Sequence, residues 1–187
     1  DMNAHHDRAL NLDRINTAPL ADVLALLDGL YEHSSWVVEA ALAGRPFATL
    51  ADLKHAMAEV VRHAGHERQL VLIRAHPELA GSALTAGTLT RDSSHEQSLS
   101  GLAHGSPDEV HALHELNNAY TARFGWPFVL AVRGPTGRGL TRAEIIAALR
   151  HRLVATPEVE MDECLRQIDR IAEIRLHERM GLGLEAG

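Results

Sequence analysis

The chain has 187 residues, of which 45% are hydrophobic, and its formal net charge is −7 with the 13 histidines counted as neutral. This length suits one domain with its own core, and no apolar run approaches the roughly 20 residues that a membrane-spanning helix needs. The negative charge and the scatter of the 17 arginines argue against a nucleic-acid-binding protein that follows phosphates. The single cysteine, Cys164, excludes an internal disulfide and any metal site built from several cysteines, and it favours a reducing compartment.

Apolar residues recur at three- and four-residue steps along nearly the whole chain, and this periodicity predicts helices. In chain order, the predicted helices cover residues 20–30, 34–43, 50–61, 66–75, 94–104, 107–124, 142–153 and 157–180. Capping-box patterns at Ser93, Ser106 and Thr141 support three of the helix starts. We therefore predict an all-α fold, a single-domain helical bundle of about eight or nine helices over residues 1–187, with residues 1–10 poorly ordered.

Two segments interrupt the helical pattern. Residues 76–93 form a connection rich in glycine, serine and threonine that is long enough to suggest a functional role. The run from Phe128 to Val132 is strand-like, but it is too short and too isolated to build a sheet. Four of the seven aromatic residues lie between Tyr120 and Phe128. They could wall a pocket, although such a group more often forms the densest part of the core.

His76 lies directly before a proline, at the end of the helix predicted over residues 66–75. The residue before a proline is pushed out of the α region, so we expect His76 to end its helix in an extended conformation. An imidazole that titrates near neutrality is the usual general acid or base. The structural alternative, which is the more common one, is a helix-end histidine whose positive charge interacts with the carbonyl end of the helix dipole.

The segment from Ser93 to Gln97 has two interpretations as well. Ser93 and Glu96 match a capping box, a device that this sequence uses elsewhere. The first amides of a helix lack partners, however, and readily bind anionic or carbonyl oxygens. Since only one loop and one helical turn separate His76 from Glu96, the fold could bring these two side chains together.

Arg175 is predicted at the rim of the apolar face of the last helix. That face consists of apolar residues at helical spacing: Met161, Leu165, Ile168, Ala172 and Leu176. At 100° per residue, Arg175 projects within about 20° of Ile168. Arginines are seldom placed there unless they are paired, extend to the surface or bind an anionic ligand. A structural salt bridge is the commoner of these explanations.

Metal and cofactor motifs are missing from the sequence. The pairs His63 with His66 and His111 with His114 could each share a ligand face, but neither has an obvious third ligand nearby, and no HExxH motif occurs. There is also no GxGxxG, P-loop or GxSxG motif. The only lysine, Lys54, is predicted on the polar side of its helix, which disfavours imine chemistry and pyridoxal phosphate. We expect neither a metal nor an organic cofactor.

Several short motifs occur along the chain, and their combined order and spacing is more specific for a protein family than any single motif. They are Arg45-Pro-Phe47, His76-Pro-Glu-Leu-Ala-Gly81, Gly87-Thr-Leu-Thr90, Ser93-x-x-Glu96-Gln97, Leu116-Asn117 with Tyr120, Arg123-Phe-Gly-Trp-Pro-Phe128 and Ile174-Arg175-Leu176. Over most of its length the chain thereby resembles the 2-oxo-4-hydroxy-4-carboxy-5-ureidoimidazoline (OHCU) decarboxylases of the urate-to-allantoin pathway. The departures are Trp126, where that family usually has a smaller aromatic residue, and the loop 134–141.

The resemblance implies an all-helical, usually dimeric enzyme that converts its substrate to (S)-allantoin and CO2 without a cofactor. By motif, the catalytic histidine falls on His76 and its carboxylate partner on Glu96. The implied substrate-binding residues are Pro77, Ser93, Ser94, His95, Glu96, Gln97, Phe128, Val129, Leu130, Ala131, Val132 and Arg175.

The implied chemistry agrees with the scarcity of lysine. Loss of CO2 leaves an electron pair that the substrate's own C=N bond can delocalise, so the protein needs only to orient the ring and move protons. In this hypothesis His76 removes the hydroxyl proton or delivers the proton that sets the product's configuration, and Glu96 orients His76. Arg175 and the helix-start amides would hold the ring oxygens and the ureido group.

Two other functions remain open from the sequence: a histidine-rich helical metal-binding protein, and a helical interaction module without chemistry. Bound metal in the purified protein would favour the first, and full tolerance of His76→Ala in every assay would favour the second. The N-terminal residues lack a basic flank followed by an apolar core, and the C-terminus lacks a peroxisomal SKL signal, so we expect a cytoplasmic protein. The resemblance implies a homodimer that binds a small-molecule substrate, and we expect no nucleic-acid or membrane partner.

Overall fold

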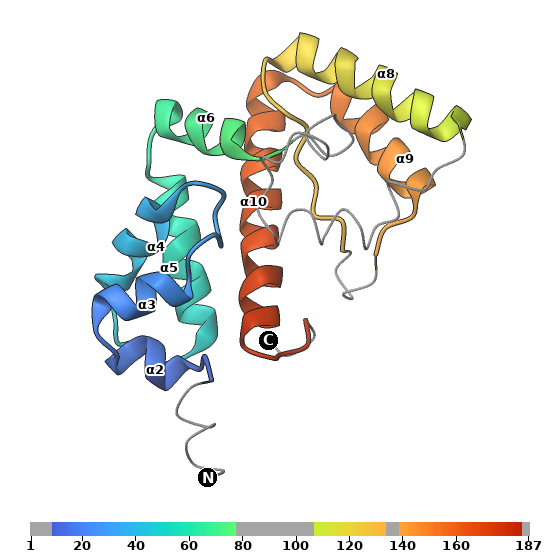
Figure 1. The fold of residues 1–187 in the computed structure, drawn as a ribbon. Coiled ribbons are helices and arrows are strands. Elements are labelled where there is room, and N and C mark those ends of the chain that lie inside the picture. The colour runs from blue at the N-terminus through green and yellow to red at the C-terminus, as the bar shows by residue number, and fades with distance from the viewer. Residues whose placement is uncertain (1–8, 78–106, 134–138, 185–187) are drawn as a thin grey trace.

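The computed structural model describes residues 9–77, 107–133 and 139–184 (Figure 1). Within these ranges the secondary structure consists of eight helices and one isolated bridge between Arg133 and Gly139. The helices are α2 (Leu12–Thr17), α3 (Leu20–Leu26), α4 (Ser35–Leu42), α5 (Leu50–Arg62), α6 (His66–Ala75), α8 (Pro107–Phe124), α9 (Arg142–Leu153) and α10 (Pro157–Arg179). The predicted all-α fold class is confirmed.

Five of the predicted helices from residue 34 onward agree closely with the observed ones, and the helix predicted over 157–180 ends one residue early. The capping box predicted at Thr141 is present, because Thr141 accepts the N–H of Glu144 and the Glu144 side chain accepts the N–H of Thr141. The helix predicted over 94–104 and the capping boxes at Ser93 and Ser106 lie outside the described residues.

The N-terminal helices differ from the prediction for local reasons. The helix predicted to reach Leu30 ends at Leu26, and the chain then turns through Gly29 with a φ of 81°, a backbone conformation that a glycine adopts without steric strain. The six-residue helix α2 is too short to show an apolar repeat. Its start is fixed by Asn11, whose side chain accepts the N–H of Arg14 at 2.8 Å.

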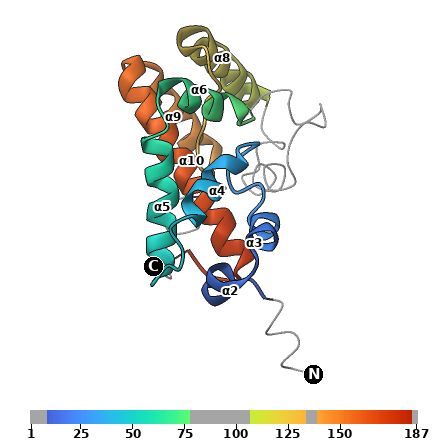
Figure 2. The ribbon, with the colours of Figure 1, turned by 90° about the vertical axis from the view of Figure 1, so that its left-hand side faces the viewer.

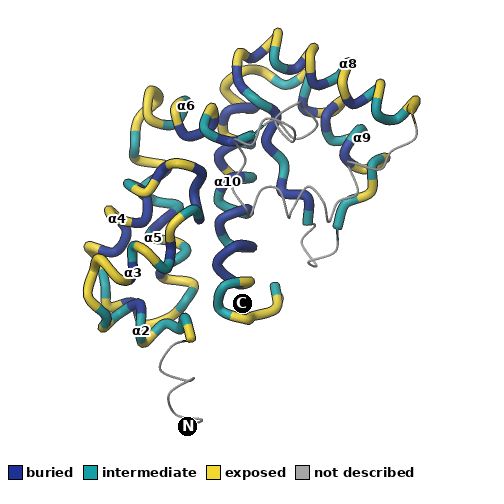
Figure 3. The backbone as a smooth tube through the Cα atoms, viewed as in Figure 1, coloured by how far each residue is buried: buried dark blue, intermediate teal, exposed yellow. Residues whose placement is uncertain are grey.

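Helix α10 is the central element of the fold. It lies between the helices α2 to α6 and the pair formed by α8 and α9 (Figures 1 and 2). Because α10 has neighbours on both sides, its burial extends well beyond one narrow apolar stripe (Figure 3). The buried side chains of α10 include Glu160, Arg175 and His177, three polar residues that need partners inside the protein. None of the described helices is both long and apolar enough to cross a bilayer.

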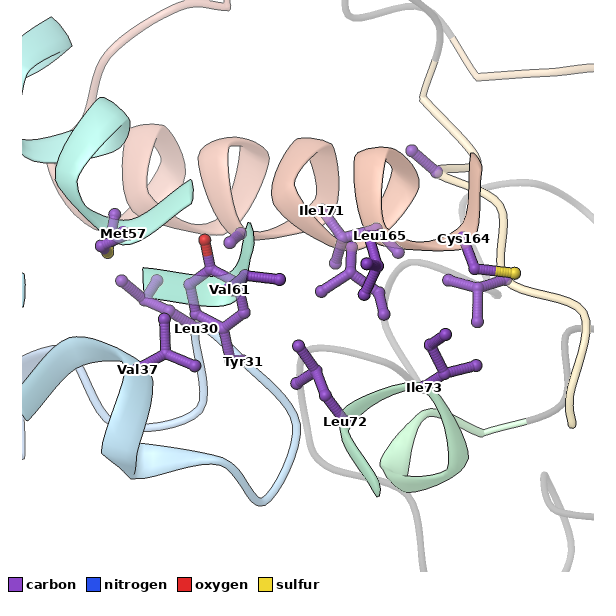
Figure 4. Close-up of a cluster of buried hydrophobic side chains, with 14 of the residues drawn as sticks. Leu30, Tyr31, Val37, Met57, Val61, Leu72, Ile73, Cys164, Leu165 and Ile171 are labelled. Carbon is purple, nitrogen blue, oxygen red and sulfur yellow. The ribbon is translucent and has the colours of Figure 1, made fainter. Parts of the chain in front are cut away.

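Apolar side chains from the loop between α3 and α4 and from the helices α4, α5, α6 and α10 pack together in the core (Figure 4). Those labelled in the figure are Leu30, Tyr31, Val37, Met57, Val61, Leu72, Ile73, Cys164, Leu165 and Ile171. Leu72 and Ile73 of α6 are fully buried. The last turn of α6 is thus fixed against the rest of the protein, and this turn leads directly to His76.

The aromatic residues in the last turns of α8 and directly after it form part of the core, as the sequence favoured. The ring centroid of Tyr120 lies 4.8 Å from that of Phe124 and 5.2 Å from that of Phe128. Gly125, with a φ of 75°, ends α8, and the chain then runs without regular structure from Trp126 to Val132. Most of this run is buried, which leaves little freedom for its backbone.

The motif Arg45-Pro-Phe47 has a structural role at the other end of the molecule. Nη1 of Arg45 donates to the carbonyl oxygens of Ile15 and Ala18 at 3.0 and 2.8 Å, which satisfies acceptors at the end of α2. The side chain of Asn16 accepts the N–H of Phe47 at 2.7 Å and donates to its carbonyl at 2.9 Å. This motif therefore joins α2 to the segment before α5.

Candidate active site

His76 is the C-cap residue of α6 and has a φ of −77° and a ψ of 140°, so the predicted extended conformation is confirmed. Its side chain is buried and lies 3.0 Å, through Nδ1, from the carbonyl oxygen of Leu72. A carbonyl can only accept, so Nδ1 carries the proton and the other ring nitrogen, Nε2, has a lone pair. Within the part of the chain that the structure describes, Nε2 has no hydrogen-bond partner. The Leu72 carbonyl thus holds the imidazole in one tautomer, and none of the described residues bonds to its basic nitrogen.

Burial lowers the pKa of His76 to about 4, from an ordinary value near 6.5. The carbonyl of Leu72 opposes this shift, the positive charge of Arg175 adds to it, and the carboxylate of Glu32 opposes it. The side chain is consequently neutral at physiological pH. A neutral imidazole with a free Nε2 can accept a proton, which is the property required of a general base.

Arg175 projects from α10 into the interior and is 1% exposed. Its guanidinium donates to the carbonyl oxygen of Gly29 at 2.9 Å and to that of Leu30 at 3.5 Å, and Nη2 lies 3.1 Å from Oε1 of Glu32. From its place on the helix alone, the commoner expectation for Arg175 is a structural salt bridge, whereas the family resemblance implies substrate oxygens as its partner. The ion pair with Glu32 is such a salt bridge, and substrate contact by Arg175 stays a prediction.

Glu32 is the residue of this cluster that the sequence did not identify. It lies in the loop between α3 and α4 and is 1% exposed, which is exceptional for a carboxylate unless it is paired. Its partner is 143 residues away in the chain. The only feature of the sequence that could have indicated a buried Glu32 is its position directly after the apolar pair Leu30-Tyr31. Charged loop residues in such positions are usually exposed.

The run from Phe128 to Val132, predicted to contact the substrate through its backbone, is already tied to the protein at three points. The carbonyl of Val129 accepts from Nη1 of Arg152, and the N–H of Ala131 donates to Oε1 of Gln167 at 3.0 Å. The carbonyl of Val132 accepts the N–H of Leu140 at 2.7 Å. These bonds fix the backbone of the run. They also occupy some of the backbone groups that were expected to bind the substrate. Contact of Phe128, Val129, Leu130, Ala131 and Val132 with substrate stays a prediction.

Arg152 belongs to a buried polar network behind this run. Its guanidinium pairs with Glu160 at 2.6 Å and is stacked over the ring of Phe128, 4.4 Å from the ring centroid. Glu160 also accepts the hydroxyl of Tyr120 at 2.6 Å, and that hydroxyl accepts Nε1–H of Trp126 at 2.9 Å. Burial raises the pKa of Tyr120, so its hydroxyl stays protonated and available to donate.

Ser93, Ser94, His95, Glu96 and Gln97 lie outside the described residues, so their predicted roles are not tested. Pro77 is half-buried and follows His76 directly. Within the described residues, no group of three or more histidine, cysteine or acidic side chains is arranged to hold a metal ion.

Comparison with known proteins identifies the family. A family model for OHCU decarboxylase matches residues 16–177. The 2-oxo-4-hydroxy-4-carboxy-5-ureidoimidazoline decarboxylase of Haloferax volcanii is 34% identical over 91% of this chain and 96% of its own length. This chain belongs to the OHCU decarboxylase family.

The other relatives of this OHCU decarboxylase family member include longer proteins. The uric acid degradation bifunctional protein PucL of Bacillus subtilis is 39% identical over 89% of this chain, but the chain spans only 31% of PucL. A crystal structure of (S)-allantoin synthase superposes with a TM-score of 0.70 at 30% identity, covering 91% of this chain and 54% of that one. An OHCU decarboxylase crystallised in the presence of (S)-allantoin has a TM-score of 0.60 at 20% identity, which supports the fold.

A cavity of about 420 Å³ lies elsewhere in this OHCU decarboxylase family member, between α5 and α10, and His76 does not line it. Its wall includes Tyr31 and Asp169, whose hydroxyl and carboxylate oxygens are 2.9 Å apart. Burial raises the pKa of Asp169 to about 6, although the hydrogen bond from Tyr31 opposes the shift. Lys54 also lines this cavity and is paired with Glu173 at 3.1 Å. Because these polar groups satisfy one another, we assign no ligand to the cavity.

Proposed function

We propose that this chain catalyses the decarboxylation of 2-oxo-4-hydroxy-4-carboxy-5-ureidoimidazoline to (S)-allantoin and CO2 in urate degradation. The observation that supports this most directly is the neutral, buried His76, whose Nδ1–H is bound to the Leu72 carbonyl and whose Nε2 is free among the described residues. This geometry leaves the imidazole unprotonated and able to accept a proton at neutral pH, in a chain whose relatives are decarboxylases by name.

The reaction needs one bond cleavage and a set of proton transfers. The bond between the ring carbon and the carboxylate breaks and CO2 leaves. The released electron pair forms a C=C bond to the carbon that bears the ureido group, and the π electrons of the adjacent C=N bond move to its nitrogen, which takes up a proton from solvent. The resulting enol then loses its hydroxyl proton, and the carbon that bears the ureido group gains a proton. In our proposal, Nε2 of His76 accepts the hydroxyl proton and returns it to that carbon on one face of the ring, which would set the S configuration.

The remaining roles follow the family motifs. Glu96 would orient the His76 imidazole, and the segment from Ser93 to Gln97 would bind substrate oxygens through amides and side chains. Arg175 would stabilise negative charge on the substrate, because its guanidinium is buried, where charge interactions are strong, and its charge acts on His76. We also propose that the enzyme works without a metal or an organic cofactor, as a homodimer in the cytoplasm.

The test is to generate the unstable substrate in situ from urate and to follow CO2 release together with the chirality of the allantoin formed. Without an enzyme, protonation occurs on both faces of the ring and gives a racemate. The proposal predicts faster CO2 release and an excess of (S)-allantoin, and both should survive exhaustive chelation. A racemic product at the spontaneous rate would refute the function, and loss of activity on chelation would refute the metal-free mechanism.

A further inference from the structure

The loop between α3 and α4 surrounds the guanidinium of Arg175 with oxygen acceptors. The carbonyls of Gly29 and Leu30 accept from Nη1, and Oε1 of Glu32 accepts from Nη2 at 3.1 Å. The side chains of Arg175 and Glu32 are each 1% exposed. Removing both charges from water is costly, so an ion pair of this kind is a poor means of stabilising a fold compared with apolar packing.

The backbone of this loop is bent in a way that directs Glu32 inward. His33, the next residue, has a φ of 49°, in the left-handed region that residues other than glycine seldom adopt. Its own side chain is 66% exposed, while that of Glu32 is buried. The hydroxyl of Ser34 donates to the Glu32 carbonyl at 2.8 Å and braces the turn. Strained backbone of this type persists where the surrounding structure requires it, and it concentrates at functional sites.

The ion pair lies close enough to His76 for both charges to act on the imidazole. Arg175 on α10 disfavours protonation of His76, and Glu32 in the α3–α4 loop favours it. The exposed His33 of the same loop also disfavours protonation of His76, as Arg175 does, but more weakly. If Glu32 lost its charge, the buried guanidinium would act on His76 with less compensation.

We propose that Glu32 is a positioning residue for the decarboxylation, which holds the Arg175 guanidinium beside His76 and balances its positive charge there. This inference rests on the proposed function. Glu32 does not need to touch the substrate. It determines where a buried cation lies and how strongly that cation acts on the catalytic imidazole.

The test compares Glu32→Gln, which removes the charge, with Glu32→Asp, which keeps the charge on a shorter side chain. The control is Glu173→Gln, because Glu173 is also an ion-paired glutamate, but its partners are Lys54 of α5 and Arg170 of α10 instead of Arg175. We expect Glu32→Gln to lower kcat/KM about 10- to 100-fold, the scale of loss that a small misplacement in an active site causes. Glu32→Asp should recover part of this loss, and Glu173→Gln should stay within about twofold of the wild type.

A second readout separates positioning from a purely structural role. In Glu32→Gln the pKa of His76 should fall below its wild-type value, as followed by NMR titration of the imidazole over the pH range where the protein stays folded, whereas Glu32→Asp should leave it nearly unchanged. A lower melting temperature with unchanged kcat/KM and unchanged titration would overturn the proposal. If Glu32→Gln does not fold, Glu32→Asp still decides, because wild-type kcat/KM in that variant would contradict a positioning role. Failure of the wild type to form (S)-allantoin would refute the proposed function, and the titration would still report whether Glu32 acts on His76.

Discussion

The Nδ1 nitrogen of His76 donates to the carbonyl oxygen of Leu72, one turn earlier in the same helix, over 3.0 Å. This bond forms because Pro77 ends α6 and pushes His76 out of the helical conformation, so that its side chain folds back on the last turn. A neighbouring helix provides a natural comparison. His63 is the C-cap of α5 and makes the same type of bond, from Nδ1 to the carbonyl of Glu59 at 2.9 Å, but its side chain is exposed.

This pair of histidines gives the first prediction. His76→Gln should lower turnover about 100- to 10,000-fold, the usual contribution of a general acid or base. Its free energy of unfolding should change by only about 1 kcal/mol, because one hydrogen bond from the side chain to the Leu72 carbonyl is lost. His63→Gln removes the equivalent bond at an exposed helix end and should leave turnover unchanged. Steady-state kinetics and thermal unfolding of both variants provide the measurement, and equal turnover in the two would remove His76 from the mechanism.

The pH dependence of His76 is the second prediction. Because its pKa in the folded protein is about 4 and that of an unfolded histidine is about 6.5, the unfolded chain takes up a proton first as the pH falls. Above pH 6.5, protonation of His76 does not lower the free energy of unfolding. Between pH 6.5 and 4 it lowers this free energy by up to about 3 kcal/mol. His76→Gln should therefore be less sensitive to acid than the wild type in denaturant unfolding at pH 5 and pH 8. The wild-type kcat/KM should fall with an apparent pKa near 4, and a fall centred near 6.5 would contradict this assignment.

The sequence was sufficient for features that depend on local chain chemistry. Helical periodicity located α10, and the restriction that Pro77 places on the residue before it predicted the extended conformation of His76. The pairing of Glu32 with Arg175 could not be predicted from the sequence, because no periodic pattern links a loop residue to a helix residue 143 positions later. The burial of both charges follows from the packing of the α3–α4 loop against α10, a tertiary relationship that a single sequence does not encode in any local motif.

Glu96 gives a third prediction that separates capping from catalysis. Glutamine preserves a capping box, so Glu96→Gln should leave the melting temperature nearly unchanged. If Glu96 orients His76, turnover should nevertheless fall about 100-fold or more. Parallel small losses of stability and activity would instead indicate that Glu96 only caps its helix. Glu144→Gln alters an observed capping box on α9 and serves as the matched control for the structural effect.

The buried network around Arg152 supports a fourth prediction about stability. Glu160→Gln removes the carboxylate that pairs with Arg152 at 2.6 Å and leaves a buried guanidinium without a counter-charge. Breaking a buried pair in this way costs about 3–5 kcal/mol. Glu163→Gln on the same helix breaks a pair with Arg166, whose side chain is 65% exposed, and should cost about 1 kcal/mol or less. Urea unfolding of the two variants tests the difference, and similar losses would show that burial does not determine the strength of these pairs.

Asp169 should produce a pH dependence opposite to that of His76. Burial raises its pKa to about 6 in the folded protein, whereas an unfolded aspartate titrates near 3.9. As the pH rises from about 4 to 6, the unfolded chain releases this proton first, so the fold loses up to about 3 kcal/mol of stability over that interval. Asparagine stays neutral and can still accept the hydroxyl of Tyr31 at the same position. Asp169→Asn should therefore match the wild type near pH 4 and be more stable than the wild type at pH 7, as measured by denaturant unfolding across this range. Parallel stability curves for the two proteins would show that Asp169 titrates normally in the fold.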